Sequence, residues 1–481
     1  MSALPGMLAA CVWVGGCTVG PKYEPVQTRA AGEFVGLSVP TSGMDGLKSR
    51  PFAGPAEVAR WWTTFGDQTL TSLVERAAAD NLDVAVAESR VRQARAVVDA
   101  AAAGLSPTVD VSGSAARSRT KGGGTGNVFR AGFDAAWEID AFGGIRRGVE
   151  AAGADERAAV EDWRDARVTV VAEVGSTYID LRGAQRQLAI ARENLAAQRE
   201  TLAVTKQRFE GGYISGLDVA NAESQVASTI ARVPTLESAI NASTFALGVL
   251  LGREPGALLH ELADAASIPV PPAEVPVGLP SDLLRRRPDI RSAEERIRSA
   301  TARVGVATAD LYPRFSLTGS LGVSAGDVAG LGSIANRFWS IGPGVSWPLL
   351  DGGRIRANIR VQEALATEQG LVYQRTVLTA LRDVETALVA FQTEQQRRAA
   401  LQEAEAAARR AVDLARLLYT EGKTDFLNVL SAQGQLFSTQ DALVQSERAV
   451  SGNLVALYKA LGGGWESNER ESQQENVNPE P

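Results

Sequence analysis

The chain of 481 residues contains an internal duplication, and this feature constrains its fold more than any other. Matching residues recur in the same order, at an offset of 206 residues in the early part of the chain and 210 residues further on. The matched pairs include Asp83 and Asp289, Leu105 and Leu311, Trp137 and Trp347, and Gly212 and Gly422. A repeat of this length indicates a duplicated structural unit rather than a short solenoid period. We therefore expect two repeats, 67–252 and 281–464, joined by a Pro-rich linker over 253–280.

Each repeat contains two segments in which apolar and polar residues alternate. They predict strands at 108–116 and 128–140 in the first repeat and at 314–324 and 338–350 in the second. Period two over about 10 residues is typical of a strand that crosses a membrane with one face towards lipid. Tryptophans near the strand ends fit the aromatic girdles of membrane interfaces, namely Trp137, Trp339 and Trp347. The same alternation also fits two soluble hairpins with one buried face.

A membrane-spanning role for these strands would require oligomerisation. The chain has no apolar run of about 18 residues, so no transmembrane helix is expected and spanning would depend on strands. Four strands are too few to close a barrel, which needs about eight, and open strand edges are not tolerated in lipid. Several copies of the chain would therefore have to contribute strands to one barrel.

Long helical segments are expected after the strands of each repeat. Apolar residues recur every seven positions, which favours coiled-coil packing. In the first repeat they are Leu181, Leu188, Leu195, Leu202 and Phe209. A helix from about 146 to 210 would be on the order of 100 Å long. Glycine-containing breaks near 211–216 and 421–424 predict that each long helix reverses into a second one, and Pro234 should kink the first returning helix. Each repeat thus reads helix, strand, strand, long helix, helix.

The N-terminus is predicted to be a lipoprotein signal peptide over residues 1–16. Small and apolar residues end in Val-Gly-Gly before Cys17, which resembles the lipobox of bacterial lipoproteins. Cys17 would then carry acyl chains at the start of an N-terminal segment over 17–66, and each buried CH₂ of those chains would contribute about 0.8 kcal/mol. A plain buried cysteine is the alternative. The expected basic region is missing before the apolar stretch, which leaves open a start codon further upstream.

The inventory of reactive residues argues against an enzyme. The chain has one histidine, His260, and two cysteines, so zinc sites and histidine-based catalysis are not expected. No catalytic residue, metal ligand or cofactor is predicted, and the net charge of −7 argues against nucleic acid as a partner. The arginines at 285–287 are expected to precede a helix that begins at Pro288 rather than to bind an anion. Polar residues 465–481 are expected to form a disordered tail.

Several motifs together resemble the TolC family of outer-membrane efflux factors, in the lipoprotein branch that includes OprM and NodT. The motifs are Cys17–Tyr23, Trp61–Trp62 with Phe65–Asp67, Trp137–Gly143, Leu284–Ile290, Arg208–Val219 and Tyr419–Leu427. The resemblance covers nearly the whole chain after the signal peptide. It implies a mainly α fold with a membrane β part, in which three copies form a 12-stranded β-barrel and a long periplasmic α-helical barrel.

The function that the resemblance implies is the exit duct of a tripartite efflux system in the outer membrane. Its cargo would be small molecules such as drugs and toxic compounds. The implied partners are two sister copies, a periplasmic adaptor (membrane fusion) protein, an inner-membrane transporter of the RND type and outer-membrane lipid. A channel for metal efflux or type I protein secretion is an alternative, and a non-conducting structural lipoprotein is a further one.

The resemblance also assigns residues to a periplasmic gate. Asp218 and Tyr419 fall where the family holds its helices shut, and the constriction falls at Leu427, Asn428 and Ser431. The tips that would dock the adaptor are Gly211, Gly212, Tyr213, Gly422, Lys423 and Thr424. Family members often have carboxylates where this chain has Asn428 and Ser431, so we predict weak cation selectivity and weak block by divalent ions. Alternatively, Asp218 is a helix cap, and Asn428 and Ser431 belong to a solvated helix face.

Overall fold

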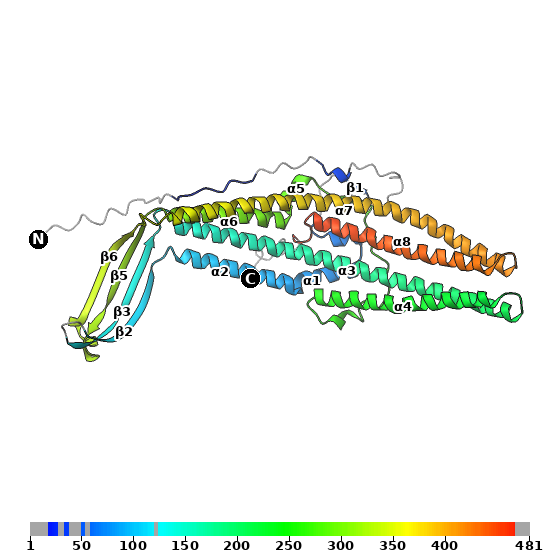
Figure 1. The fold of residues 1–481 in the computed structure, drawn as a ribbon, viewed down its shortest axis with the longest axis horizontal. Coiled ribbons are helices and arrows are strands. Elements are labelled where there is room, and N and C mark those ends of the chain that lie inside the picture. The colour runs from blue at the N-terminus through cyan, green and yellow to red at the C-terminus, as the bar shows by residue number, and fades with distance from the viewer. Residues whose placement is uncertain (1–17, 27–32, 38–49, 53–57, 120–123, 467–481) are drawn as a thin grey trace, which may run out of the picture. The chain divides into compact units, whose positions relative to one another are not determined.

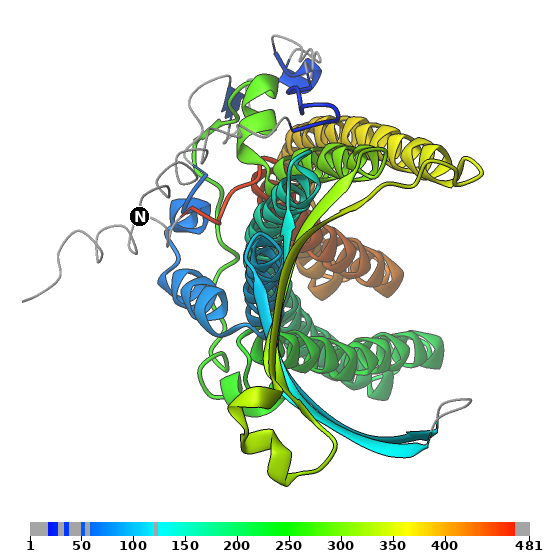
Figure 2. The same ribbon diagram turned by 90° about the vertical axis from the view of Figure 1, so that its left-hand side faces the viewer.

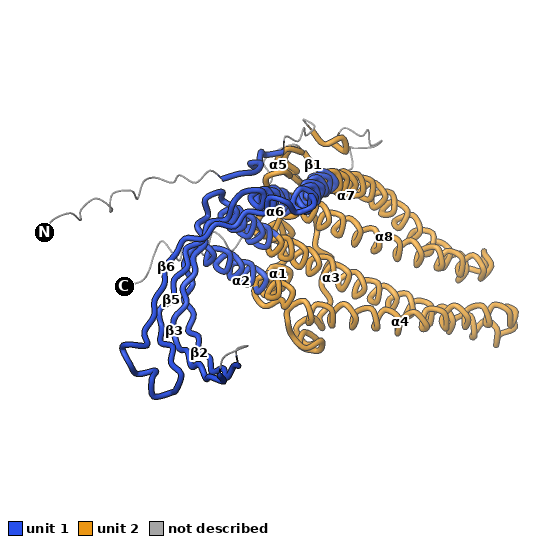
Figure 3. Tube along the Cα trace, turned by 60° about the vertical axis from the view of Figure 1, so that its left-hand side comes forward, with its two compact units in different colours: residues 1–27, 89–161, 292–375 blue, residues 28–88, 162–291, 376–481 orange. Residues whose placement is uncertain are grey.

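The computed structural model describes residues 18–26, 33–37, 50–52, 58–119 and 124–466. Contacts divide the chain into two compact units, which Figure 3 distinguishes by colour. Unit 1 comprises residues 1–27, 89–161 and 292–375, and unit 2 comprises residues 28–88, 162–291 and 376–481. Each unit therefore contains segments of both predicted repeats.

Unit 1 contains an antiparallel sheet of four strands (Figure 1). In order across the sheet, the strands are β2 (Thr108–Arg119), β3 (Thr125–Ile139), β5 (Arg314–Ala325) and β6 (Arg337–Ser346). The sheet is strongly curved (Figure 2), and β2 and β6 are its edge strands. The strand predicted over 338–350 is too long, because β6 ends at Ser346 and Pro348 lacks the N–H that a sheet ladder needs.

The register of the strands separates apolar from polar side chains. An apolar row, with side chains between 54% and 77% exposed, consists of Val111, Phe133, Leu321 and Trp339. A polar row on the opposite face consists of Asp110, Asp134, Ser320 and Ser340. Residues directly opposite each other in a sheet share a face, so each row runs across all four strands. Exposed apolar side chains in such a continuous row require cover by lipid or by another protein surface.

An aspartate starts each of the two long helices. α3 (Gly144–Glu210) follows Asp140, whose carboxylate accepts hydrogen bonds from two backbone N–H groups of the first turn. α7 (Arg354–Thr420) follows Asp351, whose carboxylate accepts hydrogen bonds from the N–H of Gly353, just before the helix, and from the N–H of Ile355 in its first turn. A carboxylate at this place satisfies N–H groups that have no partner inside the helix and interacts favourably with the helix dipole.

The same order of elements occurs twice along the chain. Before the strands lie α1 (Gln68–Asp80) and α2 (Leu82–Ala103) in the first case, and α5 (Pro280–Arg286) and α6 (Pro288–Ala309) in the second. The long helices return as α4 (Gly216–Leu250) and α8 (Phe426–Ala460). Short 3₁₀ helices are η1 (Val35–Leu37), η3 (Trp61–Phe65), η4 (Pro255–Leu258), η5 (Ala329–Gly332) and η6 (Ile334–Asn336).

Pro234, which is expected to kink α4, lies inside one uninterrupted helix. None of the described helices is both long and apolar enough to cross a membrane.

Aromatic residues form part of the core of unit 2. Trp61 and Trp62 are buried, and Trp61 stacks on Tyr458 of α8 with 5.5 Å between ring centroids. Tyr178 of α3 is also buried, and its hydroxyl donates a hydrogen bond to Asp67 at 2.9 Å. Asp67 caps α1 with its other carboxylate oxygen. These residues of the Trp-Trp and Phe-Gly-Asp motifs therefore serve packing and capping.

Two segments that were expected to be irregular contain ordered structure. The predicted linker over 253–280 includes η4 and β4 (Glu274–Pro276), and β4 pairs in parallel with β1 (Arg50–Phe52). The predicted tail over 465–481 begins too early, because Trp465 is 8% exposed and its ring contacts two arginine side chains. Burial of a large aromatic surface stabilises that position against disorder. The rest of the tail, from 467 on, lies outside the described residues.

Candidate functional site

The two hairpin tips of unit 2 have the same backbone construction. Gly212 and Gly422 adopt left-handed backbone conformations, with φ of 74° and 71°. The N–H groups of Tyr213 and Lys423 then donate hydrogen bonds to carbonyl oxygens of the preceding helix, at 2.9 and 2.8 Å. Glycine tolerates a positive φ without strain, which explains the breaks at these two positions. The predicted docking residues lie in these two turns, and Tyr213 is 80% exposed.

Asp218 caps the helix that follows the first tip. Its carboxylate accepts hydrogen bonds from the backbone N–H and the hydroxyl of Ser215, both at 3.2 Å, and the two residues form a capping box at the start of α4. The structure thus confirms that Asp218 is a helix cap. A latch role, in which Asp218 helps to hold the helices shut, stays a prediction.

Tyr419 lies in the core between the two hairpins. It is 4% exposed and packs against Phe426 with ring centroids 5.6 Å apart, in a cluster with Ala222 and Val429. Arg208 of α3 stacks over the Tyr419 ring at 4.5 Å and donates a hydrogen bond to its backbone carbonyl at 2.6 Å. Tyr419 therefore joins α3 to α7 inside one chain, and Arg208 is a gate candidate that sequence reasoning missed.

The predicted constriction residues share an exposed face at the start of α8. Leu427 is 64% exposed, and Asn428 and Ser431 are exposed beside it. Asn428 donates a hydrogen bond to the Thr424 hydroxyl at 2.8 Å. The opposite face of the helix buries Val429 in the tip core. The structure thus brings the three candidates together, and both a lumen-facing role and a solvated face fit this arrangement.

Polar contacts also join the two hairpins above the tips. The Gln433 amide donates a hydrogen bond to the Thr201 hydroxyl at 3.0 Å, in a buried position. The Asn194 amide donates a hydrogen bond to the Gln440 side chain at 2.9 Å. These bonds link α3 to α8, and the apolar heptads of α3 give no indication of them. Buried hydrogen-bonded side chains fix one register between helices, because a shift would leave them unpaired.

Cys17, the predicted lipid anchor, lies outside the described residues, but its neighbours are held in unit 1. Val19 donates its N–H to the Phe142 carbonyl at 3.2 Å. Arg147 is 4% exposed and donates a hydrogen bond to the Val19 carbonyl at 3.2 Å. A Cβ atom on Gly143 would meet the Cα of Thr18 at 2.9 Å, so only glycine allows this approach. The chain after Cys17 is therefore fixed beside the β3–α3 junction.

Neither a metal centre nor a free anion site emerges from the described part of the chain. No group of three or more His, Cys, Asp or Glu side chains there is arranged to hold a metal ion. Arg285 and Arg286 belong to the last turn of α5, and α6 begins at Pro288 as predicted. Arg287 forms an ion pair with Asp289 at 2.7 Å, so its charge is already compensated.

Comparison with known protein families gives one match that extends over most of the chain. The family described as outer membrane efflux protein matches residues 73–253 and 279–463. These two ranges nearly coincide with the two predicted repeats.

Individual relatives match over nearly their full length. The chain is 35% identical over 458 residues to nodulation protein T of Rhizobium leguminosarum bv. trifolii, covering 94% of this chain and 95% of the relative. It is 32% identical over 476 residues to the pyoverdine export outer membrane protein OpmQ of Pseudomonas aeruginosa, covering 96% and 97%. Among solved structures, the outer-membrane channel OprN is similar with a TM-score of 0.86 and 38% identity, covering 94% of this chain and all of that one.

Proposed function

Because this chain belongs to the outer membrane efflux protein family and is an outer-membrane channel that serves in export, we propose that it is the passive exit duct of a tripartite efflux system for small molecules. The long helices form its periplasmic extension and the four strands its membrane part. The pyoverdine exporter among its relatives supports a small-molecule cargo. The duct itself performs no chemistry in this proposal, and the energy comes from an inner-membrane transporter.

The observation that carries the proposal is the amphipathic sheet with two free edges. An apolar row crosses all four strands on one face, and a polar row crosses them on the other. Apolar residues facing lipid and polar residues facing water are what a membrane channel wall requires. Since four strands cannot close a barrel and about eight are the minimum, three copies would join β6 of one chain to β2 of the next.

Two measurements on the purified protein test the duct and its trimeric state. Native mass spectrometry from detergent should give three chains in one particle, and planar bilayers should show single-channel currents that flow without an energy source. A monomer without conductance would refute the proposal. A conducting particle with another number of chains would refute only the trimer.

The exposed tips support docking of a periplasmic adaptor. Tyr213 and Lys423 project from turns whose backbone is held by hydrogen bonds to the preceding helix, so the tips present a defined surface. We expect a cysteine introduced at Tyr213 to cross-link to the adaptor in cells that also express the transporter, which is of the RND type in this proposal. A cysteine at Asp413, exposed on α7 away from the tip turns, serves as the control. Equal cross-linking at both positions would argue against tip docking.

The contacts of the segment after Cys17 support its role as the lipid anchor. Thr18 and Val19 are fixed against Gly143, Phe142 and Arg147, close to the end of β3. An acylated Cys17 beside a strand end would lie near the membrane surface. Intact mass measurement should show the added acyl chains, and Cys17→Ser should abolish them. Acylation that persists in Cys17→Ser would exclude this residue as the anchor.

A further inference from the structure

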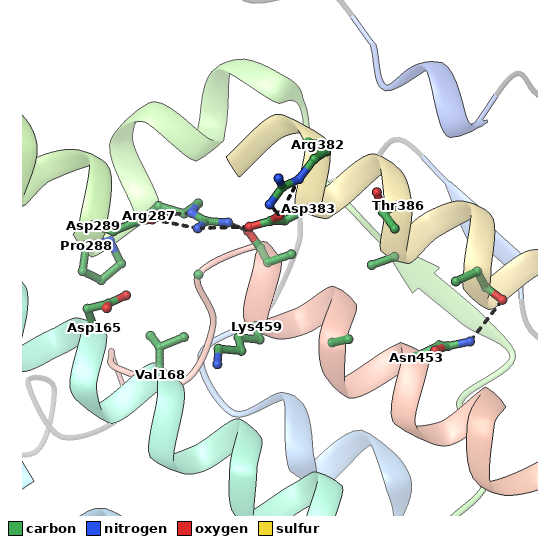
Figure 4. A pocket seen from close by; sticks show the side chains of 15 residues that line it. Asp165, Val168, Arg287, Pro288, Asp289, Arg382, Asp383, Thr386, Asn453 and Lys459 are labelled. Atoms are coloured by element: carbon green, nitrogen blue, oxygen red, sulfur yellow. Dashed lines mark hydrogen bonds and ion pairs between the residues drawn. The ribbon is translucent and has the colours of Figure 1, made fainter. Parts of the chain in front are cut away.

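Unit 2 contains a cavity of about 460 Å³ that none of the gate or tip residues lines. Figure 4 shows side chains from α3, α7, α8 and the α5–α6 junction around it. Its volume lies in the range of sites that bind small molecules, which is about 300–1,000 Å³. The cavity is therefore large enough to hold a small molecule.

Four of its ionic groups already neutralise one another. Arg287 binds both carboxylate oxygens of Asp289, at 3.0 and 2.7 Å, and donates a further hydrogen bond to the Ala460 carbonyl at 2.8 Å. Arg382 binds one carboxylate oxygen of Asp383 at 2.7 Å. The Arg287 contacts join the α5–α6 junction to the end of α8. Within each pair the charges compensate each other, so neither pair offers an unmatched charge to a ligand.

Two further ionic groups in the lining form no close ion pair of this kind. Asp165 of α3 and Lys459 of α8 line the same cavity (Figure 4). Within the described part of the chain, no hydrogen bond or close ion pair joins either side chain to another residue, although the charges of Arg287 and Lys459 act on Asp165 at longer range and favour its ionised form. Burial, together with the nearby charge of Asp289, raises the pKa of Asp165 to about 6. A half-buried carboxylate without a partner is unfavourable, so a cation placed beside it would be stabilising.

The remainder of the lining is largely apolar. It includes Val168, Pro288, Ala387, Ala390 and Ala456. Small side chains leave room beside the two charges, and the aliphatic surface would favour an apolar group on the occupant.

We propose that this cavity binds a small zwitterion with an apolar side chain, whose ammonium group contacts Asp165 and whose carboxylate contacts Lys459. An occupant with only a positive charge would satisfy Asp165 but lie near the Lys459 ammonium, which is exposed to solvent. An occupant with only a negative charge would contact Lys459 favourably but lie near the Asp165 carboxylate. A molecule with both charges matches both groups, and its apolar part covers the alanine-rich wall. This site is independent of conduction and docking, so it extends the proposed function without resting on it.

Isothermal titration of the purified full-length protein with the dipeptide leucyl-leucine tests the proposal. We expect saturable binding, and about tenfold weaker binding for leucyl-leucine amide and for N-acetyl-leucyl-leucine, because each lacks one charge. Asp165→Asn and Lys459→Gln should each weaken binding of leucyl-leucine by a similar factor. The matched controls Asp413→Asn and Lys206→Gln change the same charges at exposed positions outside the lining and should bind like the parent.

The pH dependence of binding provides a second readout. The charged groups that act on Asp165 are Asp162 on its own helix, Arg287 and Asp289 at the α5–α6 junction and Lys459 on α8. Arg382 and Asp383 of α7 line the same cavity. Because the dipeptide needs the ionised carboxylate, its affinity should fall as the pH drops below about 6, and Asp165→Asn should remove this fall. Unchanged affinity in Asp165→Asn, equal affinity of the singly charged analogues, or no saturable binding would each overturn the proposal. Single-channel conductance of Asp165→Asn should equal that of the parent, which separates this site from the duct.

Discussion

The indole N–H of Trp137 donates a hydrogen bond to the backbone carbonyl of Leu105 at 2.9 Å, which ties the end of β3 to the residues that lead into β2. Trp347 forms the same bond with Leu311 in the second half of the chain, at 3.0 Å. A tryptophan near a strand end can thus bury part of its ring and still satisfy its polar atom. The duplicated bond fixes the helix-to-strand passage in both halves.

Replacement of Trp137 by phenylalanine should destabilise the channel, because it removes the hydrogen bond to the Leu105 carbonyl. Phe keeps most of the aromatic surface but leaves the Leu105 carbonyl without its donor, at a cost of about 1 kcal/mol per chain. The midpoint of thermal unfolding, followed by circular dichroism, should therefore fall. Trp339→Phe is the control, because Trp339 is 75% exposed and forms no hydrogen bond in the part of the chain that the structure describes. Equal effects of the two changes would contradict this account.

Replacement of Arg208 by lysine should loosen the hairpin tips. Lysine keeps the charge but loses the planar stack on Tyr419, a change of about 1–2 kcal/mol. We expect a higher open probability in planar bilayers. Arg192→Gln is the control, since Arg192 forms its ion pair with Glu237 inside the first hairpin, at 2.9 Å. An open probability that matches the parent would show that the Arg208 contact does not hold the tips closed.

Introduction of a carboxylate at Asn428 should make the channel cation-selective. In a trimer the new aspartates would lie around one axis, attract cations and bind divalent ions. The parent should show weak selectivity and weak block by millimolar Mg²⁺, and Asn428→Asp should increase both. Reversal potentials in a salt gradient and currents with added Mg²⁺ measure these effects. Strong block of the parent would contradict the prediction.

Replacement of Asp218 by asparagine distinguishes a cap from a latch. An asparagine side chain can still accept the hydrogen bonds from Ser215, so a purely capping role predicts a loss of less than about 1 kcal/mol and unchanged currents. Ser215→Ala, which removes the other half of the capping box, should lower the midpoint of unfolding more. If Asp218→Asn opens the channel while its unfolding midpoint is unchanged, the carboxylate acts as a latch that helps to hold the helices shut.

Replacement of Asp165 by asparagine should stabilise the protein at neutral pH. The pKa of Asp165 is raised to about 6, so the folded state disfavours its ionised form. This cost is absent below the ordinary pKa of an aspartate, grows as the pH rises towards 6 and is complete above it, where it reaches at most about 3 kcal/mol. Asp165→Asn should therefore unfold at a higher temperature than the parent at pH 7.5, without ligand, and at a similar temperature near pH 4. If the difference in unfolding temperature persists unchanged at pH 4, it is caused by packing and not by the charge of Asp165.

The sequence alone predicts the elements and the family, because their signals are local. Alternation along 129–139 depends only on neighbouring residues in a strand, and the leucine spacing from Leu181 to Leu202 depends only on the helical repeat. Glycines at 212 and 422 mark turns because of their own backbone freedom. The prediction is wrong where local patterns are ambiguous, as at the end of β6 and at Trp465.

The tertiary structure decided which of these local features meet. The row from Val111 to Trp339 exists because β3 pairs with β5 of the other half in one register, and no local pattern specifies that register. Arg208 and Tyr419 lie 211 positions apart in the chain, yet they stack at 4.5 Å. Asp165 and Lys459 line one cavity only because α3 and α8 fold beside each other. Contacts between distant segments depend on the packing of whole helices and strands, so a single sequence specifies the parts of this channel more clearly than the sites between them.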